Sequence, residues 1–137
     1  LEVKKGELTF IYNSDIFRDR EALGYAKSLR DHKIKEVDVT SDQLTEQQLM
    51  DLAYRLDKPP EELIDKQSAP YKNEYAGKNL DTEDTLKAIR NTPHLLKTPI
   101  AVFHDKAYVV ASPYDFVKKG MRVEGIKERV DKKNKDH

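Results

Sequence analysis

The sequence predicts an α/β fold in which two parallel strands, joined by a helix, share a four-stranded mixed sheet with a later β-hairpin. The first observation is alternation: Leu8, Phe10 and Tyr12 place an apolar side chain at every second residue, and residues 33–40 are again rich in β-branched side chains. The second is helical spacing between these two segments, which is typical of a parallel βαβ unit. The third is residues 98–110, TPIAVFHDKAYVV, where two apolar runs flank a polar turn and predict an antiparallel hairpin.

The turn after the first strand is the first candidate site. Asn13, Ser14 and Asp15 interrupt the alternation and are common turn or N-cap residues, so we expect the helix to start near Asp15. In open α/β folds, ligands bind at the carboxyl ends of the strands, which is where this turn lies. The helix itself is predicted from apolar residues at helical spacing, which are Ala22, Leu23, Ala26 and Leu29.

A helical block, residues 41–97, separates the strand pair from the hairpin. Its first helix is predicted over residues 41–57, because Thr45 and Gln48 have the spacing of a capping box. The residues that follow repeat at i, i+3, i+4 and i+7 and give the helix one apolar face. They are Leu49, Leu52, Ala53 and Leu56.

The rest of the helical block has weaker local signals. Pro60 stands at the first position of a short helix, where a proline is well tolerated. Residues 66–78 are polar and predict an exposed loop with one helical turn, which carries Tyr71 and Tyr75. A further helix is predicted over residues 81–91. Its two candidate N-caps are Asp81 and Thr82.

The chain ends with a short helix, which Ser112 and Pro113 begin, and a charged extension. We expect one domain, residues 1–120, with a helical insertion at about residues 41–97. Residues 121–137 form a charged C-terminal extension whose end is expected to be disordered. The order of strand, helix, strand, helical block, hairpin and helix is that of a thioredoxin-type domain with an inserted helical subdomain.

The composition excludes several function classes. Lys plus Arg and Asp plus Glu are 25 each, so the zero formal charge gives no reason to expect direct binding of nucleic acid or of an anionic membrane. Without a cysteine, the chain's own side chains can form no disulfide and perform no thiol chemistry. No apolar run approaches ~18 residues, and no signal-peptide core is present, so we expect a soluble, cytoplasmic protein. The four histidines lack metal-motif spacing, so no metal site is predicted.

Three stretches of the chain are informative beyond their secondary structure: LTFIYNS in the first strand and turn, LTEQQLMDLAYRLDKPPEELIDKQSAPYK in the middle helices, and NTPHLLKTPIAVFHDKAYVVASPYDF at the end. Together they resemble the bacterial arsenate reductase family, which also contains the Spx transcriptional regulators. The patterns PEELI…K.S..Y and P.LL..PI, in this order and spacing, are fairly specific together. The resemblance covers residues 7–119 and implies the thioredoxin-like fold.

The resemblance also implies a site that has lost its chemical groups. Family enzymes use a cysteine at the N-terminus of the first helix; that position is Phe17 here, and the second cysteine of the Spx-type C-x-x-C falls on Arg20. The family's three oxyanion-binding arginines match Asp65, Thr98 and Ser112. Since phenylalanine is no nucleophile and all three positive charges are missing, arsenate reduction by the family mechanism is rejected.

The dipeptide Thr98-Pro99 matches a feature of the family that this sequence keeps. In thioredoxin-like proteins this proline is cis, and the residue before it offers its backbone N–H and C=O groups to an extended peptide or to glutathione. The alternative is that the proline only shapes the start of the third strand. The candidate ligand groove lies between the first turn and this dipeptide, and its residues are Asn13, Ser14, Phe17, Thr98 and Pro99.

For most side chains around the first turn, we favour a structural role over a functional one. Phe17 is expected to plug the ancestral site by packing against Pro99, and the alternative is a protruding binding anchor. Ser14 is interpreted as a turn or N-cap residue rather than a nucleophile, because no histidine has triad context. The charged residues here predict a solvated, self-paired cluster rather than a phosphate site, and they are Asp15, Arg18, Asp19 and Arg20.

These observations favour a non-catalytic binding or regulatory module without thiol redox activity. We expect no resident cofactor, an unknown protein or small molecule as ligand, and a monomer or weak dimer. The resemblance makes regulation conceivable, since Spx proteins bind RNA polymerase. One alternative is a glutathione-dependent reductase or transferase, in which glutathione bound at the Thr98-Pro99 groove supplies the sulfur. Another is a scaffold protein with no ligand groove.

Overall fold

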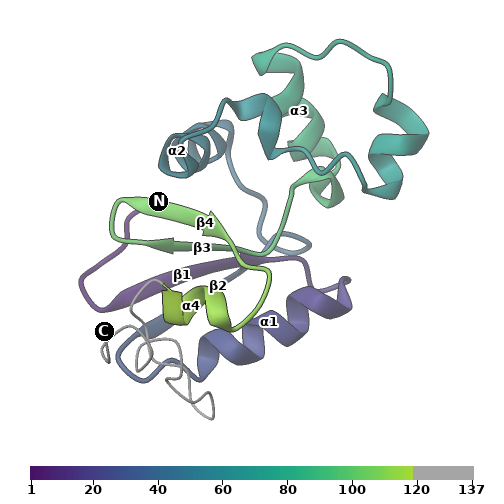
Figure 1. Ribbon diagram of the computed structural model, residues 1–137. Helices are drawn as coiled ribbons and strands as arrows, with labels where there is room; N and C mark the ends of the chain where they lie inside the picture. The colour runs from purple at the N-terminus through teal and green to yellow at the C-terminus, as the bar shows by residue number, and fades with distance from the viewer. Residues whose placement is uncertain (119–137) are drawn as a thin grey trace, which may run out of the picture.

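The computed structural model describes residues 1–118, and a four-stranded mixed sheet lies at the centre of this part of the chain (Figure 1). The sheet consists of β1 (Glu7–Tyr12), β2 (Lys33–Asp38), β3 (Ile100–Phe103) and β4 (Lys106–Val109). β1 pairs in parallel with β2 and antiparallel with β3, and β3 pairs antiparallel with β4, which gives the order β2-β1-β3-β4. The predicted fold class is confirmed.

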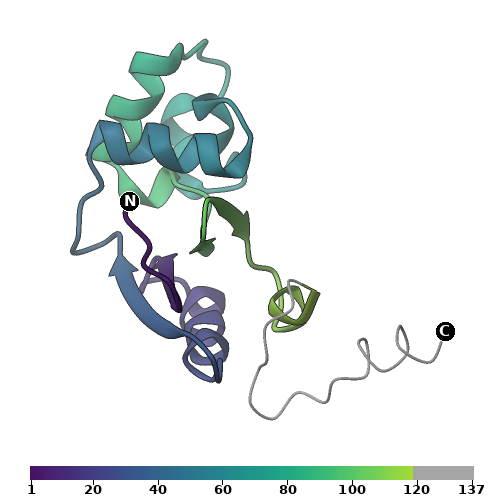
Figure 2. The same ribbon diagram turned by 90° about the vertical axis from the view of Figure 1, so that its left-hand side faces the viewer.

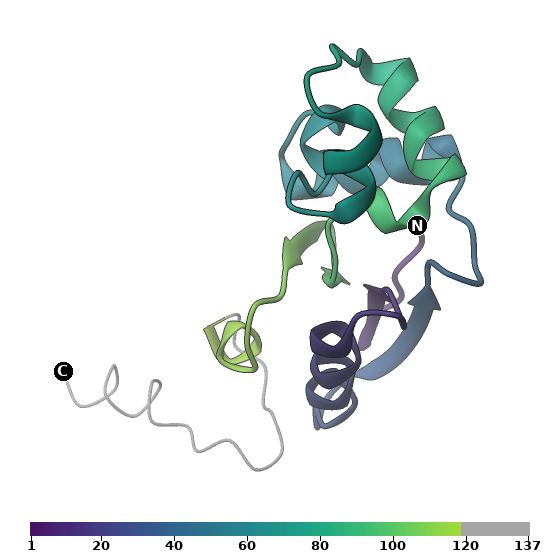
Figure 3. The same cartoon turned by 90° about the vertical axis from the view of Figure 1, so that its right-hand side faces the viewer.

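Helices cover both faces of this sheet. α1 (Phe17–Lys27) and α4 (Tyr114–Lys118) lie on one face, and α2 (Glu46–Leu56) and α3 (Thr82–Asn91) lie on the other (Figure 1). Figures 2 and 3 show the segments between β2 and β3 gathered into one helical subdomain above the sheet. Three short turns complete this subdomain: the 3₁₀ turns Pro60–Leu63 and Pro93–Leu95 and the π-helical turn Tyr71–Tyr75.

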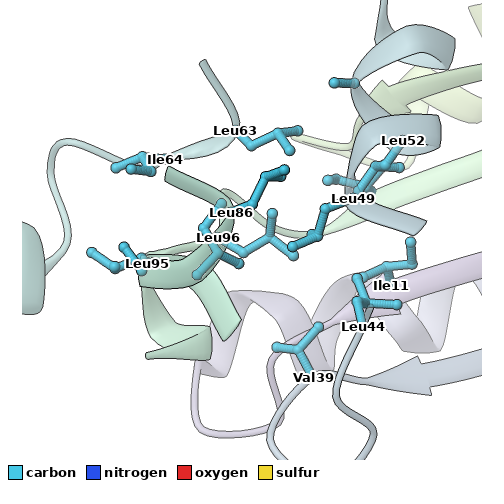
Figure 4. Close-up of a cluster of buried hydrophobic side chains, with 14 of the residues drawn as sticks. Ile11, Val39, Leu44, Leu49, Leu52, Leu63, Ile64, Leu86, Leu95 and Leu96 are labelled. Carbon is cyan, nitrogen blue, oxygen red and sulfur yellow. The ribbon is translucent and has the colours of Figure 1, made fainter. Parts of the chain in front are cut away.

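The alternation along β1 divides the apolar side chains between two cores, because successive residues of a strand point to opposite faces. Leu8 and Phe10 pack with the alanines of α1 and with Phe116 of α4. Ile11, one residue on, faces the helical subdomain. Figure 4 shows this second core, whose labelled side chains are Ile11, Val39, Leu44, Leu49, Leu52, Leu63, Ile64, Leu86, Leu95 and Leu96.

The helices of the subdomain begin where the capping signals stand. Thr45 Oγ1 accepts the Gln48 N–H at 3.0 Å, and the Gln48 side chain accepts the Thr45 N–H at 2.9 Å, so the predicted capping box is confirmed. α2 therefore starts at Glu46, and the prediction of a helix from residue 41 was too long. At α3 the cap is Asp81, which forms a second capping box with Asp84.

α1 begins later than the sequence predicts. Its N-cap is Ile16, which has no side-chain hydrogen bond to the helix, so Ser14 and Asp15 are not N-caps. The side chain of Asn13 instead accepts the Asp15 N–H at 2.9 Å, and the Ile16 N–H donates to the Asn13 carbonyl at 3.0 Å. These bonds close a turn ahead of the helix and delay its first residue to Phe17.

Two other expectations also need correction. β2 ends at Asp38 rather than at residue 40, because the Asp38 side chain accepts both the N–H and the hydroxyl of Thr40 and turns the chain. Tyr71 and Tyr75 are half-buried against the core of the helical subdomain rather than exposed.

The final helix follows Ser112 and Pro113, as predicted. The expected domain end at residue 120 and the extension over residues 121–137 lie outside the described residues. Within residues 1–118, no helix has the length and apolar character that crossing a membrane requires.

Candidate functional site

A cleft of about 240 Å³ opens between the first turns of α1 and the segment that leads into β3. The end of β4 and the residues after it form its third side. α1 follows the carboxyl end of β1, and this end of the strands is where open α/β folds bind ligands. Its lining consists of Arg18, Asp19, Glu21, Ala22, Tyr25, Asp65, Lys97, Thr98, Pro99, Val109, Val110, Ala111 and Ser112.

Asp19 is the central polar group of this cleft. It is only 2% exposed, and its Oδ2 accepts the Thr98 hydroxyl at 2.5 Å and the Asn13 N–H at 2.9 Å. One carboxylate oxygen therefore ties α1 both to the end of β1 and to the segment before β3. A charged group at such a burial is tolerated when hydrogen bonds satisfy it.

The pKa of Asp19 is raised above its ordinary value. Burial is the largest cause, and the neighbouring Asp65 carboxylate adds to it. The hydrogen bonds from Thr98 and Asn13 and the positive charge of Arg18 act in the opposite direction without cancelling the effect of burial. A carboxyl group with a raised pKa in a cleft is typical of a functional site.

Asp65 reaches the cleft because two distant segments pair there. Ile64 forms an antiparallel bridge with Leu96, and the Asp65 N–H donates to the Leu95 carbonyl at 2.7 Å. Asp65 and Lys97, which flank the two bridge partners, both line the cleft. Asp65, one of the predicted site positions, thus contributes a carboxylate to the cleft.

Thr98 and Pro99 form the opposite wall, and the peptide bond between them is cis. The Pro99 carbonyl accepts the Val110 N–H at 3.0 Å, which joins this wall to the end of β4. The backbone N–H and C=O of Thr98 make no hydrogen bond within the described part of the chain. One backbone donor and one acceptor are therefore available at the wall of the cleft.

Phe17 does not plug the site. Its side chain is 66% exposed, it does not line the cleft, and the Arg20 guanidinium lies 5.7 Å from its ring centroid. The geometry of α1 explains this error. With 3.6 residues per turn, a residue two positions along lies about 200° around the helix, so turning Asp19 inward turns Phe17 outward.

The prediction of a solvated, self-paired charge cluster is also wrong, because Asp19 is buried and both Asp15 and Arg20 have partners outside the cluster. Asp15 lies 2.8 Å from the Nε2 of His94, and Asp19 is buried as described. Arg20 Nη1 donates to the Ser14 carbonyl at 2.7 Å. The Ser14 hydroxyl lies 3.0 Å from that of Thr40, which agrees with a turn residue and offers no base for nucleophilic chemistry.

The structure brings together Asp65, Thr98, Pro99 and Ser112 of the predicted site residues. Asn13 is buried behind the cleft, and Ser14, Phe17 and Arg20 lie outside its lining. Sequence reasoning missed Asp19, although a signal existed: Asp19, Ala22 and Ala26 are spaced i, i+3 and i+7, which puts the carboxylate on the buried face. Among the described residues, His, Asp and Glu form no group of three that could hold a metal ion.

A mixed sheet of this order, with a cleft between the first helix and a cis-proline segment, defines a thioredoxin-like protein. The model of the ArsC family matches residues 27–116, and the chain belongs to this family. Since it contains no cysteine, it is a divergent member that lacks the catalytic cysteine.

Solved structures agree on the fold. An arsenate reductase from Vibrio cholerae superposes with a TM-score of 0.71 at 17% identity and covers 82% of this chain and 96% of its own. A Yersinia pestis protein assigned to the arsenate reductases gives 0.72 at 20% identity, covering 81% and 98%. An ArsC-related protein from Brucella melitensis gives 0.64 at 14% identity, covering 85% and 97%. No curated protein matches the chain.

Proposed function

We propose that this protein is a non-catalytic binding module whose cleft takes an extended, basic peptide segment of a partner protein. The observation that carries the proposal is the unpaired backbone N–H and C=O of Thr98 at the wall of an acidic cleft. An extended peptide can pair with one such residue through two backbone hydrogen bonds, as it does when it adds to a sheet edge.

The charges of the lining favour a basic rather than an acidic ligand. Three carboxylates face two cations: Asp19, Glu21 and Asp65 against Arg18 and Lys97. Oppositely charged surfaces attract one another during association and discriminate against partners of like charge. The pKa of Asp19 is raised mainly by burial and to a smaller extent by the Asp65 carboxylate, so a Lys or Arg side chain placed beside these carboxylates would favour their charged forms.

Glutathione is the alternative ligand, because it too could pair with the Thr98 backbone and supply the sulfur that the chain lacks. It carries two carboxylates and one ammonium group and is therefore an anion. The resemblance implies arginines in family enzymes at the positions of Asp65, Thr98 and Ser112, and this chain has no cation at any of them. The electrostatics thus disfavour glutathione, and with it a glutathione-dependent reductase or transferase.

An NMR titration of the ¹⁵N-labelled protein tests the proposal. The probes are two acetylated peptides of alternating residues, one of Val and Lys and one of Val and Glu. We expect the lysine peptide to bind more tightly, with chemical-shift changes at Thr98 and in the first turn of α1. Added salt should weaken this binding.

Matched variants sharpen this experiment. Asp65→Asn should weaken binding of the lysine peptide by roughly two- to tenfold, the usual range for one screened ion pair at a partly buried site. Asp42→Asn, an exposed acid outside the cleft, should leave it unchanged. Equal affinity for both peptides, or shift changes confined to other surfaces, would refute the basic-peptide assignment. Calorimetric binding of millimolar glutathione would favour the alternative.

A further inference from the structure

A second cavity lies within the helical subdomain and shares no lining residue with the cleft beside Pro99. Its volume is about 170 Å³, which is below the ~300 Å³ at which pockets for drug-sized ligands begin. Residues from the Pro60–Leu63 turn, the π-helical turn and α3 contribute to it. The lining consists of Glu61, Ile64, Lys66, Tyr71, Lys78, Asn79, Leu80 and Thr85.

Thr85 is the residue that indicates a binding site in this cavity rather than a gap left by imperfect packing. Its side chain is 0% exposed, and its Oγ1 has no hydrogen-bond partner among the described residues. A buried hydroxyl without a partner is costly, and nearly all buried polar groups in proteins are paired. Since Thr85 also lines the cavity, a ligand there can supply the missing partner.

Two lysines give the cavity its positive charge. Lys66 and Lys78 both line it and are exposed, and Lys78 Nζ lies 5.5 Å from the ring centroid of Tyr75. The opposing charge, Glu61, already accepts the Thr82 hydroxyl at 2.6 Å. One carboxylate thus shares the lining with two ammonium groups, and the Asn79 amide and the Thr85 hydroxyl are further groups that can donate a hydrogen bond to a ligand.

The other part of the lining is apolar. Ile64 is buried, and Tyr71 and Leu80 are half-buried at the edge of the subdomain core. A ligand that fits this surface needs a short hydrocarbon portion as well as a group that accepts several hydrogen bonds. A π-helical turn, which supplies Tyr71 here, occurs frequently at functional sites.

We propose that this cavity binds a small aliphatic carboxylic acid. The carboxylate accepts hydrogen bonds from Lys66, Lys78 and the Thr85 hydroxyl, since its two oxygens offer about four acceptor positions. The hydrocarbon chain packs on Ile64, Tyr71 and Leu80. This site shares no lining residue with the cleft, so the protein combines two separate binding sites.

Titration of the full chain with isovalerate, followed by ¹⁵N NMR, tests this proposal. We expect saturable shift changes at Thr85, Tyr71 and Lys78, and none with isovaleramide, the neutral analogue of the same shape. If the amide binds as well as the acid, or if neither causes saturable changes at these residues, the proposal is wrong.

Variants identify the groups responsible. Thr85→Val should weaken isovalerate binding about tenfold, the usual loss for a hydrogen bond to a charged group, whereas Thr85→Ser should retain it. Thr85→Val should also raise the Tm of the ligand-free protein, because it removes a buried, unpaired hydroxyl. The double variant K66Q/K78Q should lose binding, and K72Q, which changes an exposed lysine of the π-helical turn outside the lining, should not. Unchanged affinity in both Thr85→Val and K66Q/K78Q would overturn the assignment. Peptide binding at the cleft should be unaffected throughout.

Discussion

The start of α1 and the starts of α2 and α3 are built in opposite ways. α2 and α3 each begin at a capping box formed by residues three positions apart, Thr45 with Gln48 and Asp81 with Asp84. α1 begins at Ile16 without a side-chain cap. The carboxylate in its first turn, Asp19, accepts hydrogen bonds from the Asn13 N–H and the Thr98 hydroxyl, which lie outside the helix.

The helix starts of the helical subdomain are therefore set by neighbouring residues in the sequence, whereas the start of α1 depends on contacts with distant segments. The helical subdomain has its boundaries encoded locally, and its leucine-rich faces meet in one core. The first turn of α1 is held by tertiary hydrogen bonds to segments far away in the sequence, and the candidate cleft lies there. Functional sites are the places where a protein most often departs from local sequence rules.

The largest effect should come from the core of the helical subdomain. Leu52 is 0% exposed, so Leu52→Ala should lower the free energy of unfolding by about 2–5 kcal/mol. Met50→Ala, on the exposed side of α2, is the matched control and should change it by less than ~0.5 kcal/mol. Urea denaturation followed by circular dichroism measures both. Similar costs for the two variants would contradict the packing of α2 onto the sheet.

The next largest loss of stability should come from the first turn of α1. Asp19→Ala leaves the Asn13 N–H and the Thr98 hydroxyl without their acceptor, which should cost about 1–3 kcal/mol at neutral pH. Asp15→Ala, which removes an exposed partner of His94, should cost under ~1 kcal/mol. If Asp19→Ala is as mild as Asp15→Ala, α1 does not depend on this tertiary anchor.

The pH dependence of Asp19 has a defined sign. Its pKa is raised in the folded state, so the folded protein binds this proton more tightly than the unfolded chain does. The stabilisation of the wild type relative to Asp19→Asn should be fully present below the ordinary pKa of 3.8 and should decline as the pH rises through the raised value. Urea midpoints of both proteins across this range measure the difference. A difference that grows with pH would contradict the assignment.

A smaller loss of stability should follow from removing the N-cap of α2. Thr45→Ala removes the acceptor of the Gln48 N–H and should lower stability by about 1 kcal/mol. Ser14→Ala should stay within ~0.5 kcal/mol, because Ser14 does not cap α1. Equal losses in urea midpoint would mean that Ser14 caps a helix after all.

The smallest effect should follow from Phe17→Ser. The ring is mainly exposed and touches Arg20 rather than the cleft, so stability should change by less than ~0.5 kcal/mol. Binding of the lysine peptide should persist, because Phe17 does not line the cleft. A loss above about 2 kcal/mol would restore the interpretation of Phe17 as a buried plug.

The sequence by itself determined the fold class, the mixed sheet and the helical insertion. These features follow from periodicity, capping boxes and proline positions, which act over a few residues and therefore leave a readable local signal. The sequence also determined that the side chains of this chain supply no thiol, since no cysteine is present. The matched positions Asp65, Thr98 and Ser112 did meet in one cleft.

Only the tertiary structure decided which way the first turn of α1 faces. Asn13 and Asp15 had two uses open to them, as caps of α1 or as parts of a turn before it, and the local sequence supports both. The outcome depends on Thr98, which is distant along the chain and donates its hydroxyl to Asp19. That contact turns Asp19 into the cleft and Phe17 into solvent. The unpaired Thr85 hydroxyl is likewise a property of packing, because its environment comes from segments that are brought together by the fold.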